Sequence, residues 1–332
     1  MGAVMTNAVA LALVAEAIYG TEVVPTDALL ITEQPQLTHD DSFDEDEYLS
    51  LNASSLAPDR QHNKLDLSAT GIIGPMEDIV DGTPAPSLHA LLIASGHTVA
   101  TAGSAGSGNF VEYKPKSVGI GSATAYAFYK ERTAGLLSVL KHIGLRVNWT
   151  LQIQPGSKMS LAAEGSALHS FPAPFAAATA PATQGKGLGG WAAKCLSATV
   201  DGRPVKLVSF ELARGLEVGS EEDDVTACND GVTEILADAG NIEATLVIEY
   251  DSALIAAAGP DNHIKASHDA DIDHAVVITR DDGVQTWTLT MPKVRFLDMQ
   301  TGDGDRNKTW ELACRLQPTT GDDEYTMRWE VA

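Results

Sequence analysis

The chain has 332 residues, and its 22 Lys and Arg against 45 Asp and Glu give a formal net charge of −23 at pH 7. Because 44% of the residues are hydrophobic, the chain can bury a core, which excludes a disordered acidic tail. Gripping duplex nucleic acid needs Lys and Arg facing phosphates, so the acidic balance also argues against a nucleic-acid-binding protein.

The first predicted element is a helix over residues 9–18. Val9, Leu13 and Ala17 fall there at helical spacing, and Gly20 follows to end the helix. The segment contains Glu16 and has no Lys or Arg before it, so it reads as neither a signal peptide nor a membrane span. We therefore expect a soluble chain that does not bind membranes.

Two further short helices are predicted from apolar stripes. Residues 86–95 carry Leu88, Leu91 and Leu92 on one side and precede a glycine. Residues 232–239 form the counterpart of this helix in the second half of the chain and also end at a glycine.

The dominant period along the rest of the chain is two, which is typical of half-buried strands. The cleanest case is residues 145–153, whose apolar face holds Leu145, Val147, Trp149, Leu151 and Ile153. Similar alternation begins at Ile242, Trp287, Trp310 and Tyr325. These patterns predict antiparallel sheets with one wet face.

The order of the predicted elements repeats along the chain. Strands and turns in residues 124–160 follow the same order as those in residues 275–309, although the residues themselves differ. Between them, residues 171–190 are rich in Ala, Pro, Gly and Thr, which is a linker composition. We predict a mainly β protein of two tandem domains, residues 1–178 and 190–332, with a linker at 179–189 and a short flanking helix in each domain.

Clusters that could carry chemistry have simpler explanations. The acidic stretch at residues 40–47 lacks a turn glycine, so we predict a solvated arm and not a metal site. The His/Asp cluster at 263–274 is predicted to be a hydrated loop, and a divalent ion there stays an open alternative. The glycine-rich residues 102–109 are followed by no phosphate-binding lysine. We predict no catalytic residue, cofactor or metal. Three cysteines without close spacing, Cys195, Cys228 and Cys314, fit a reducing compartment.

Several short motifs carry a family resemblance in their order. They are residues 11–20 with Tyr19-Gly20, residues 27–31, residues 88–96, Tyr113-Lys114-Pro115, Pro172-Ala173-Pro174 and residues 321–325. Together, over nearly the whole chain, they resemble the tail tube (major tail) proteins of long-tailed, non-contractile bacteriophages. The acidic segment and residues 51–70 are longer than the family pattern.

The resemblance implies a β sandwich or partial barrel that self-assembles into stacked rings around a channel, as a structural protein of the virion tail and not an enzyme. It implies assembly in the host cytoplasm, tape-measure and tail-terminating proteins as partners, and DNA that passes during ejection without specific binding. If two units of a six-membered ring lie in each chain, three chains suffice because 2 × 3 = 6, so we favour a trimer with pseudo-sixfold symmetry.

Two sets of residues are candidates for roles in such an assembly. The segment at about 40–70 is predicted to be an arm that reaches a neighbouring ring or subunit, with apolar anchors at Phe43, Tyr48, Leu49 and Leu51. The polar alternates of the long strands are predicted to line a negative lumen, and they are Asn148, Thr150, Gln152, Thr286, Thr288 and Thr290.

Two other functional classes stay open. A β-sandwich adhesin or receptor-binding virion module would also be a repeated β protein without chemistry. A carbohydrate-active enzyme is the weaker alternative, because 7 Tyr and 5 Trp give little surface for stacking on sugars.

Overall fold

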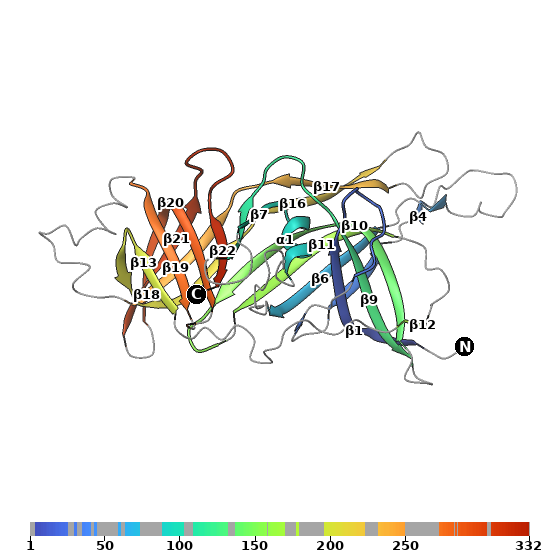
Figure 1. Cartoon of the computed structure of the whole chain (residues 1–332), viewed down its shortest axis with the longest axis horizontal. Coiled ribbons are helices and arrows are strands. Elements are labelled where there is room, and N and C mark those ends of the chain that lie inside the picture. Colours follow the sequence, from blue (N-terminus) through green and yellow to red (C-terminus); the bar gives the residue numbers. More distant parts are fainter. Residues whose placement is uncertain are drawn as a thin grey trace, which may run out of the picture.

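A computed structural model describes residues 4–25, 30–31, 35–40, 43–44, 59–60, 64–73, 88–102, 109–131, 137–157, 159–169, 177–178, 196–222, 232–249, 272–281, 283, 285–303 and 307–331. Within these ranges the chain forms strands and one short helix, so the predicted mainly β class is confirmed (Figure 1).

The first half of the chain contributes twelve strands and the helix: β1 (Val4–Ala15), β2 (Leu30–Ile31), β3 (Gln36–Asp40), β4 (Phe43–Asp44), β5 (Asp59–Arg60), β6 (Lys64–Ile73), α1 (His89–Ala94), β7 (His97–Ala102), β8 (Phe110–Pro115), β9 (Ala123–Glu131), β10 (Leu137–Ile153), β11 (Ser160–His169) and β12 (Ala177–Ala178). The second half contributes ten strands: β13 (Leu196–Val200), β14 (Arg203–Val205), β15 (Leu207–Ala213), β16 (Leu216–Glu222), β17 (Val232–Ala239), β18 (Glu243–Glu249), β19 (His274–Asp281), β20 (Gln285–Asp303), β21 (Lys308–Leu316) and β22 (Thr326–Val331).

The strands of the first half pair in the order β1-β9-β10-β11-β6-β3, all antiparallel. The central strand β10 is 17 residues long and changes neighbours along its length. Its first part pairs with β9 as far as Leu145, and its later part pairs with β11. One strand therefore belongs to both walls of a curled sheet, as in a partial barrel.

The strands of the second half pair in the matching order β13-β19-β20-β21-β18-β15. The 19-residue strand β20 takes the place of β10, since its first part pairs with β19 as far as Val294 and its later part with β21. The same pairing order thus occurs twice, while the division into two separate domains stays a prediction.

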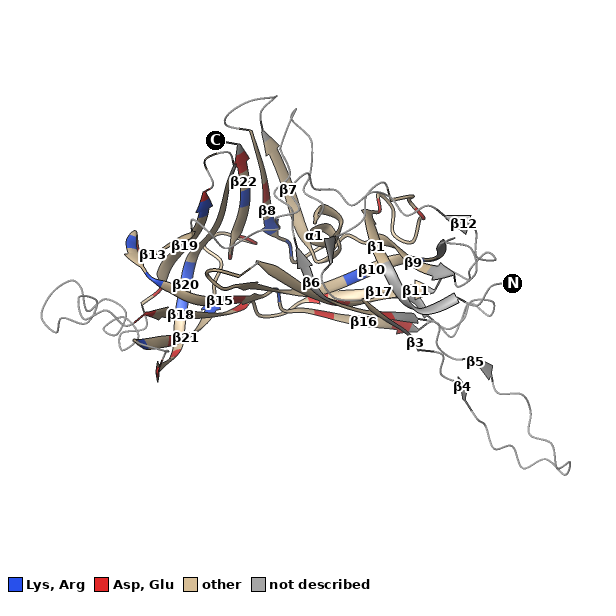
Figure 2. Ribbon diagram, turned by 90° about the horizontal axis from the view of Figure 1, so that it is seen from below, with Lys and Arg blue, Asp and Glu red and all other residues tan. Residues whose placement is uncertain are grey.

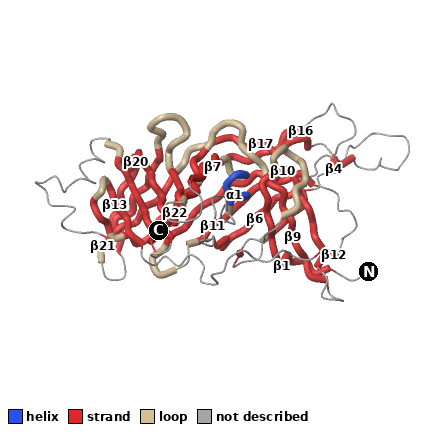
Figure 3. Tube along the Cα trace, in the orientation of Figure 1, coloured by secondary structure: helices blue, strands red, loops and turns tan. Residues whose placement is uncertain are grey.

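Among the described strands, pairing joins the two halves at two places (Figure 1). Residues 150–153 of β10 pair with residues 210–213 of β15, and β22 pairs with β8 of the β7–β8 hairpin. Figure 3 shows the strands running from one end of the molecule to the other without a break in the strand-rich body. A large apolar cluster accordingly contains Trp149 from the first half and Trp310 from the second.

The predicted alternation is confirmed in both halves. All five apolar residues proposed for residues 145–153 are buried, and so are Trp287, Leu289 and Met291 on β20. The three tryptophans Trp149, Trp287 and Trp329 are among the largest fully buried side chains. Period-two patterning therefore located the core correctly where one face of the strand is wet.

Only the middle one of the three predicted helices is confirmed, as α1, whose Leu91 and Leu92 are buried. Residues 9–18 are wrong as a helix, because they belong largely to β1. Leu11 and Leu13 join the main core while Ala12 joins a second cluster on the other face, so an unbroken apolar run reflects a strand buried on both faces.

The helix predicted at residues 232–239 is also wrong, because this segment is the strand β17, paired with β16. Ile235 is fully buried and Leu236 is 40% exposed, which is the alternation of a strand. The predicted flanking helix of the second half therefore has no counterpart there. The predicted linker at residues 179–189 lies outside the described residues. Just before it, Ala177 and Ala178 form β12 and pair with β10.

Candidate assembly interface

The junction between the two halves begins at the backbone of β10. Beyond the paired residues 150–153, the backbone N–H of Arg214 donates to the carbonyl of Trp149 at 2.9 Å and prolongs the ladder by one bond. The chain then turns at Gly215, where φ is +66° and an added Cβ would lie 1.9 Å from the carbonyl oxygen of Asn241. Only glycine fits this turn, which directs β16 and β17 back across the first half.

Arg214 fixes the junction from the inside, because its side chain is only 1% exposed. Its Nε donates to the carbonyl of Ser95 at 3.2 Å, and Nη2 donates to the carbonyls of Gly96 at 3.3 Å and Lys116 at 3.1 Å. A buried charge is tolerated only when such acceptors surround it. The guanidinium therefore fastens the start of the hairpin to the loops around α1.

A buried polar cluster continues from this anchor. Trp149 Nε1 donates to Ser95 Oγ at 2.9 Å, and His97 Nδ1 lies 2.8 Å from the carbonyl of Leu92. With Nδ1 as donor, His97 Nε2 accepts from the Tyr325 hydroxyl at 2.6 Å. Burial, assisted by the charge of Arg214, lowers the pKa of His97 to about 3, so this imidazole is neutral.

The β16–β17 hairpin lies over β10 and β11 of the first half (Figure 2). Tyr19 Oη accepts a hydrogen bond from the backbone N–H of Ile235 at 2.6 Å. Arg146 pairs with Glu234 at 3.0 Å, donates to the Ile235 carbonyl, and stacks with its guanidinium carbon 4.8 Å from the centre of the Tyr19 ring. Burial raises the pKa of Tyr19, which keeps the phenol neutral.

Glu16 positions Tyr19 by closing the turn that carries it. The Glu16 carboxylate accepts four hydrogen bonds of 2.6–2.9 Å, from the backbone of Gly20 and Gly144 and from the hydroxyls of Ser122 and Thr124. Gly144 has φ +65°, and an added Cβ would lie 2.8 Å from Tyr19 Cζ. Both residues are therefore needed to bring the Tyr19 ring against Arg146.

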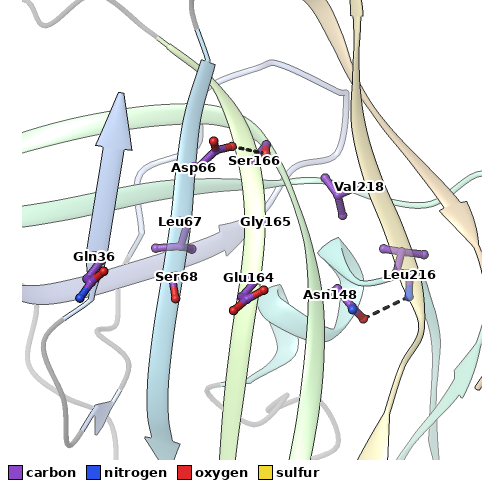
Figure 4. Close-up of a pocket in the computed structure, with 10 residues that line it drawn as sticks. All are labelled: Gln36, Asp66, Leu67, Ser68, Asn148, Glu164, Gly165, Ser166, Leu216 and Val218. Atoms are coloured by element: carbon purple, nitrogen blue, oxygen red, sulfur yellow. Dashed lines mark hydrogen bonds between the residues drawn. The ribbon is translucent and has the colours of Figure 1, made fainter. Parts of the chain in front are cut away.

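Asn148 marks the edge of a groove beneath the hairpin. Its Oδ1 accepts from the backbone N–H of Leu216 at 3.1 Å and from that of Trp149 at 3.0 Å. The groove has a volume of about 380 Å³ and, as Figure 4 shows, lies between the polar faces of β3, β6, β11 and β10 and the apolar side chains of β16. It is lined by Gln36, Asp66, Leu67, Ser68, Asn148, Glu164, Gly165, Ser166, Leu216 and Val218.

The residues predicted to line a lumen fall into two groups that the structure does not bring together. Asn148, Thr150 and Gln152 lie on the polar face of the later part of β10, with Asn148 beside the hairpin. The threonines at 286, 288 and 290 are half-buried on the first part of β20, which pairs with β19 and β22. The repeat places Asp298 and Gln300 of β20 at the positions of Asn148 and Thr150, because they pair with β21 as those two residues pair with β11.

Of the predicted arm, the structure describes only short pairings. Phe43 and Asp44 form β4 and pair with residues 59–60 of β5. The side chain of Phe43 and the whole of Tyr48, Leu49 and Leu51 lie outside the described residues.

Sequence reasoning missed the residues that make the junction, above all Arg146 and Arg214. One signal was present, since Arg146 is the one charged alternate on a strand face whose other members are Asn148, Thr150, Gln152 and Gln154. For Arg214 no signal existed, because its partners are backbone carbonyls.

Metal sites and membrane spans are the remaining possibilities for the part of the chain that the structure covers. No group of three or more His, Cys, Asp or Glu there is placed to hold a metal ion. Most of the His/Asp cluster lies outside the described residues, and its end is engaged: Asp273 accepts from Arg295 at 2.8 Å, and His274 lies 2.6 Å from Asp201. Among the described helices, none is long and apolar enough to span a bilayer.

Comparison with known proteins identifies one family. The family described as phage tail tube protein matches residues 6–290 of the chain. No curated protein matches the sequence.

Proposed function

The chain belongs to the phage tail tube protein family, whose members are structural components of the virion tail. From this premise we propose that it self-assembles into stacked rings that conduct DNA during ejection. A structural family gives no support to the alternative of a carbohydrate-active enzyme. An adhesin or receptor-binding role would need a ligand surface separate from the assembly interface.

The proposal rests on the strand pairing by which the two halves of the chain are joined. The second half attaches through β15 to the later part of β10, on the edge that β9 leaves at Leu145. The equivalent edge on the later part of β20 pairs with no described strand, and β3, which corresponds to β15, pairs only with β6 among the described strands. A second copy can therefore repeat the same junction head to tail.

The repeat also sets the number of chains. If each chain supplies two equivalent units and a ring holds six, three chains close it with pseudo-sixfold symmetry, because 2 × 3 = 6. This requires the two-domain division at residues 1–178 and 190–332, which the repeated pairing order supports. Rings of six whole chains would contradict the trimer.

We infer that the polar face of β10 looks into a channel of negative potential. Thr150 and Gln152 lie on this face, where Gln152 Nε2 donates to Glu211 at 3.3 Å and Glu311 lines the same shallow groove. Carboxylates there would repel phosphates and prevent the counterion-releasing contacts that make DNA binding tight. Thr286, Thr288 and Thr290 lie on the first part of β20, between β19 and β22, and would contribute little to a channel lined by this face of β10.

The acidic arm at about residues 40–70 is proposed to contact another subunit through Phe43, Tyr48, Leu49 and Leu51. Deleting residues 44–61 should leave a soluble, folded chain and abolish tubes, as judged by circular dichroism and electron microscopy. Tube formation by the deletion variant would remove the arm from assembly. Tape-measure and tail-terminating proteins as partners, and assembly in the host cytoplasm, follow from the family role.

Negative-stain electron microscopy of the purified chain tests the function directly. Stacked rings or tubes are expected, and the mass of single rings, measured by native mass spectrometry, should equal three chains. Dispersed monomers at all concentrations, together with specific binding to a host-surface glycan, would instead support the adhesin alternative.

A further inference from the structure

The surface that receives the β16–β17 hairpin in the first half has an equivalent in the second half. In both long strands the pairing with the preceding strand ends at one residue, Leu145 in β10 and Val294 in β20. An arginine follows in each case, so Arg295 occupies the position of Arg146. Arg146 is covered by the hairpin, whereas the side chain of Arg295 is 33% exposed and pairs with Asp273.

A second pair of residues matches in hydrogen bonding. Asn148 Oδ1 accepts from the N–H of the next residue at 3.0 Å, and Asp298 Oδ1 accepts from the N–H of Met299 at 2.8 Å. The two residues also face equivalent positions in the neighbouring strands, Glu164 in β11 and Ala313 in β21. In the first half, Asn148 receives an additional N–H from Leu216 at the start of β16.

The element that corresponds to β16–β17 is the β4–β5 hairpin, because each follows the corresponding edge strand, β15 or β3. The registers agree: Leu216 pairs with Ala239 and Glu217 with Asp238, while Phe43 pairs with Arg60 and Asp44 with Asp59. Figure 1 shows β4 at the end of the molecule opposite to β20, so this hairpin does not reach β20 of its own chain.

Charge and polarity on β20 and β21 fit such a hairpin. Arg295 and Arg315 are directly opposed across the two strands and therefore point to the same side. Between Phe296 and Asp298 the register shifts, and Leu297 there is 49% exposed. The sequence that leaves β3 is acidic, with six Asp and Glu in residues 40–47. The side chains of Arg295 and Arg315 pair with Asp273 and Glu243 but stay 33% and 43% exposed, so they can also face an acidic hairpin.

We propose that Arg295, Leu297, Asp298 and Arg315 form a docking surface for the β4–β5 hairpin of a second copy of this chain. The hairpin lies across β20 and β21 as β16–β17 lies across β10 and β11, and the backbone N–H of Phe43 donates to the Asp298 carboxylate as that of Leu216 does to Asn148. The inference deepens the proposed ring and rests on it: it names the surface used between chains in one ring.

Engineered cysteines test the arrangement. The background is Cys195→Ser and Cys228→Ser, with Cys314 retained because it is buried and burial raises its pKa to about 12. Phe43→Cys and Asp298→Cys are introduced together, and the protein is assembled and oxidised. Asn148→Cys with Leu216→Cys is the positive control, expected to form a disulfide within the chain. Phe43→Cys with Val118→Cys is the negative control, because Val118 is 76% exposed on the loop whose neighbour Ser117 bonds Asp322.

The readouts separate the inference from the function on which it rests. Electron microscopy of the cysteine-substituted parent is scored first, and absence of rings overturns both proposals. If rings form, denaturing electrophoresis should show covalent dimers and a closed trimer of 3 × 35.0 kDa, about 105 kDa, for the Phe43/Asp298 pair alone. Rings that contain only monomeric chains after oxidation, with the positive control cross-linked, would overturn the docking surface and leave the tube function standing.

Discussion

The long strands β10 and β20 are equivalent by pairing but differ in what covers them. Above β10, Arg146 reaches Glu234 and Tyr19, and the neighbouring polar residue is the neutral Asn148. Above β20, Arg295 remains partly exposed, and the corresponding Asp298 lies beside a half-exposed Leu297. The surface on β10, whose partner is in the same chain, is covered by Glu234 and Tyr19, while its equivalent on β20 keeps partly exposed charges and an exposed apolar side chain, which fits the proposed docking of a second copy.

Among the substitutions that separate the covered strand β10 from the uncovered strand β20, Arg214→Ala should lower the free energy of unfolding most. The change leaves the carbonyls of Ser95, Gly96 and Lys116 without their buried donor, so the free energy of unfolding should fall by about 3 kcal/mol. Arg295→Ala is the matched control on the uncovered strand, where a partly exposed ion pair contributes about 1 kcal/mol or less. Urea denaturation measures both, and equal losses would contradict the anchoring role of Arg214.

Gly144→Ala should destabilise the chain by about 2 kcal/mol more than Gly156→Ala, because overpacking adds to backbone strain. Both glycines have positive φ, +65° and +85°, so each substitution carries the strain of the left-handed region. Only at Gly144 would the new Cβ meet another group, the Tyr19 ring at 2.8 Å, whereas at Gly156 nothing lies within 4 Å. Thermal unfolding of the two variants isolates the contact, and identical losses would show that Tyr19 is not held there.

The junction should weaken in acid through His97. Its pKa is about 3 in the folded chain and near 6.5 when unfolded, so the unfolded state takes up the proton first as pH falls. The contribution of the neutral His97 to the free energy of unfolding is fully present above pH 6.5. It decreases as the pH falls from 6.5 to 3, and about 2 kcal/mol is lost at pH 5. The variant His97→Gln should lose less stability between pH 7 and 5 than the parent in urea titrations; parallel curves would contradict this assignment.

Tyr19→Phe should have the smallest effect, confined to the hairpin. The phenol oxygen that accepts from Ile235 is removed, so the opening free energy of β16–β17 should fall by about 1 kcal/mol. Hydrogen exchange would report this as about fivefold faster exchange of hairpin amides, with the amides of β20 and β21 unchanged. Faster exchange in both regions would mean that Tyr19 supports the whole fold.

The sequence predicted what depends on neighbours along the chain. Strict alternation at residues 145–153 and 287–291 identified buried faces correctly, and the stripe at Leu88, Leu91 and Leu92 identified α1. Residues 9–18 and 232–239 were assigned the wrong structure because a strand buried on both faces, or a hairpin lying on another sheet, lacks a clean period. The interface itself was beyond prediction, since Arg214 bonds backbone carbonyls about 100 residues away, and every residue type offers a carbonyl.

The pairing of β15 with β10 has a kinetic consequence for assembly. Since both strands belong to one polypeptide, every second junction of the proposed ring forms as the chain folds, at a rate independent of protein concentration. Closing a ring then takes three junctions between molecules instead of six, and fewer partly built rings accumulate. The junction within one chain can therefore be permanent, with Arg214 buried in it. The junction between chains can remain reversible until the ring is complete.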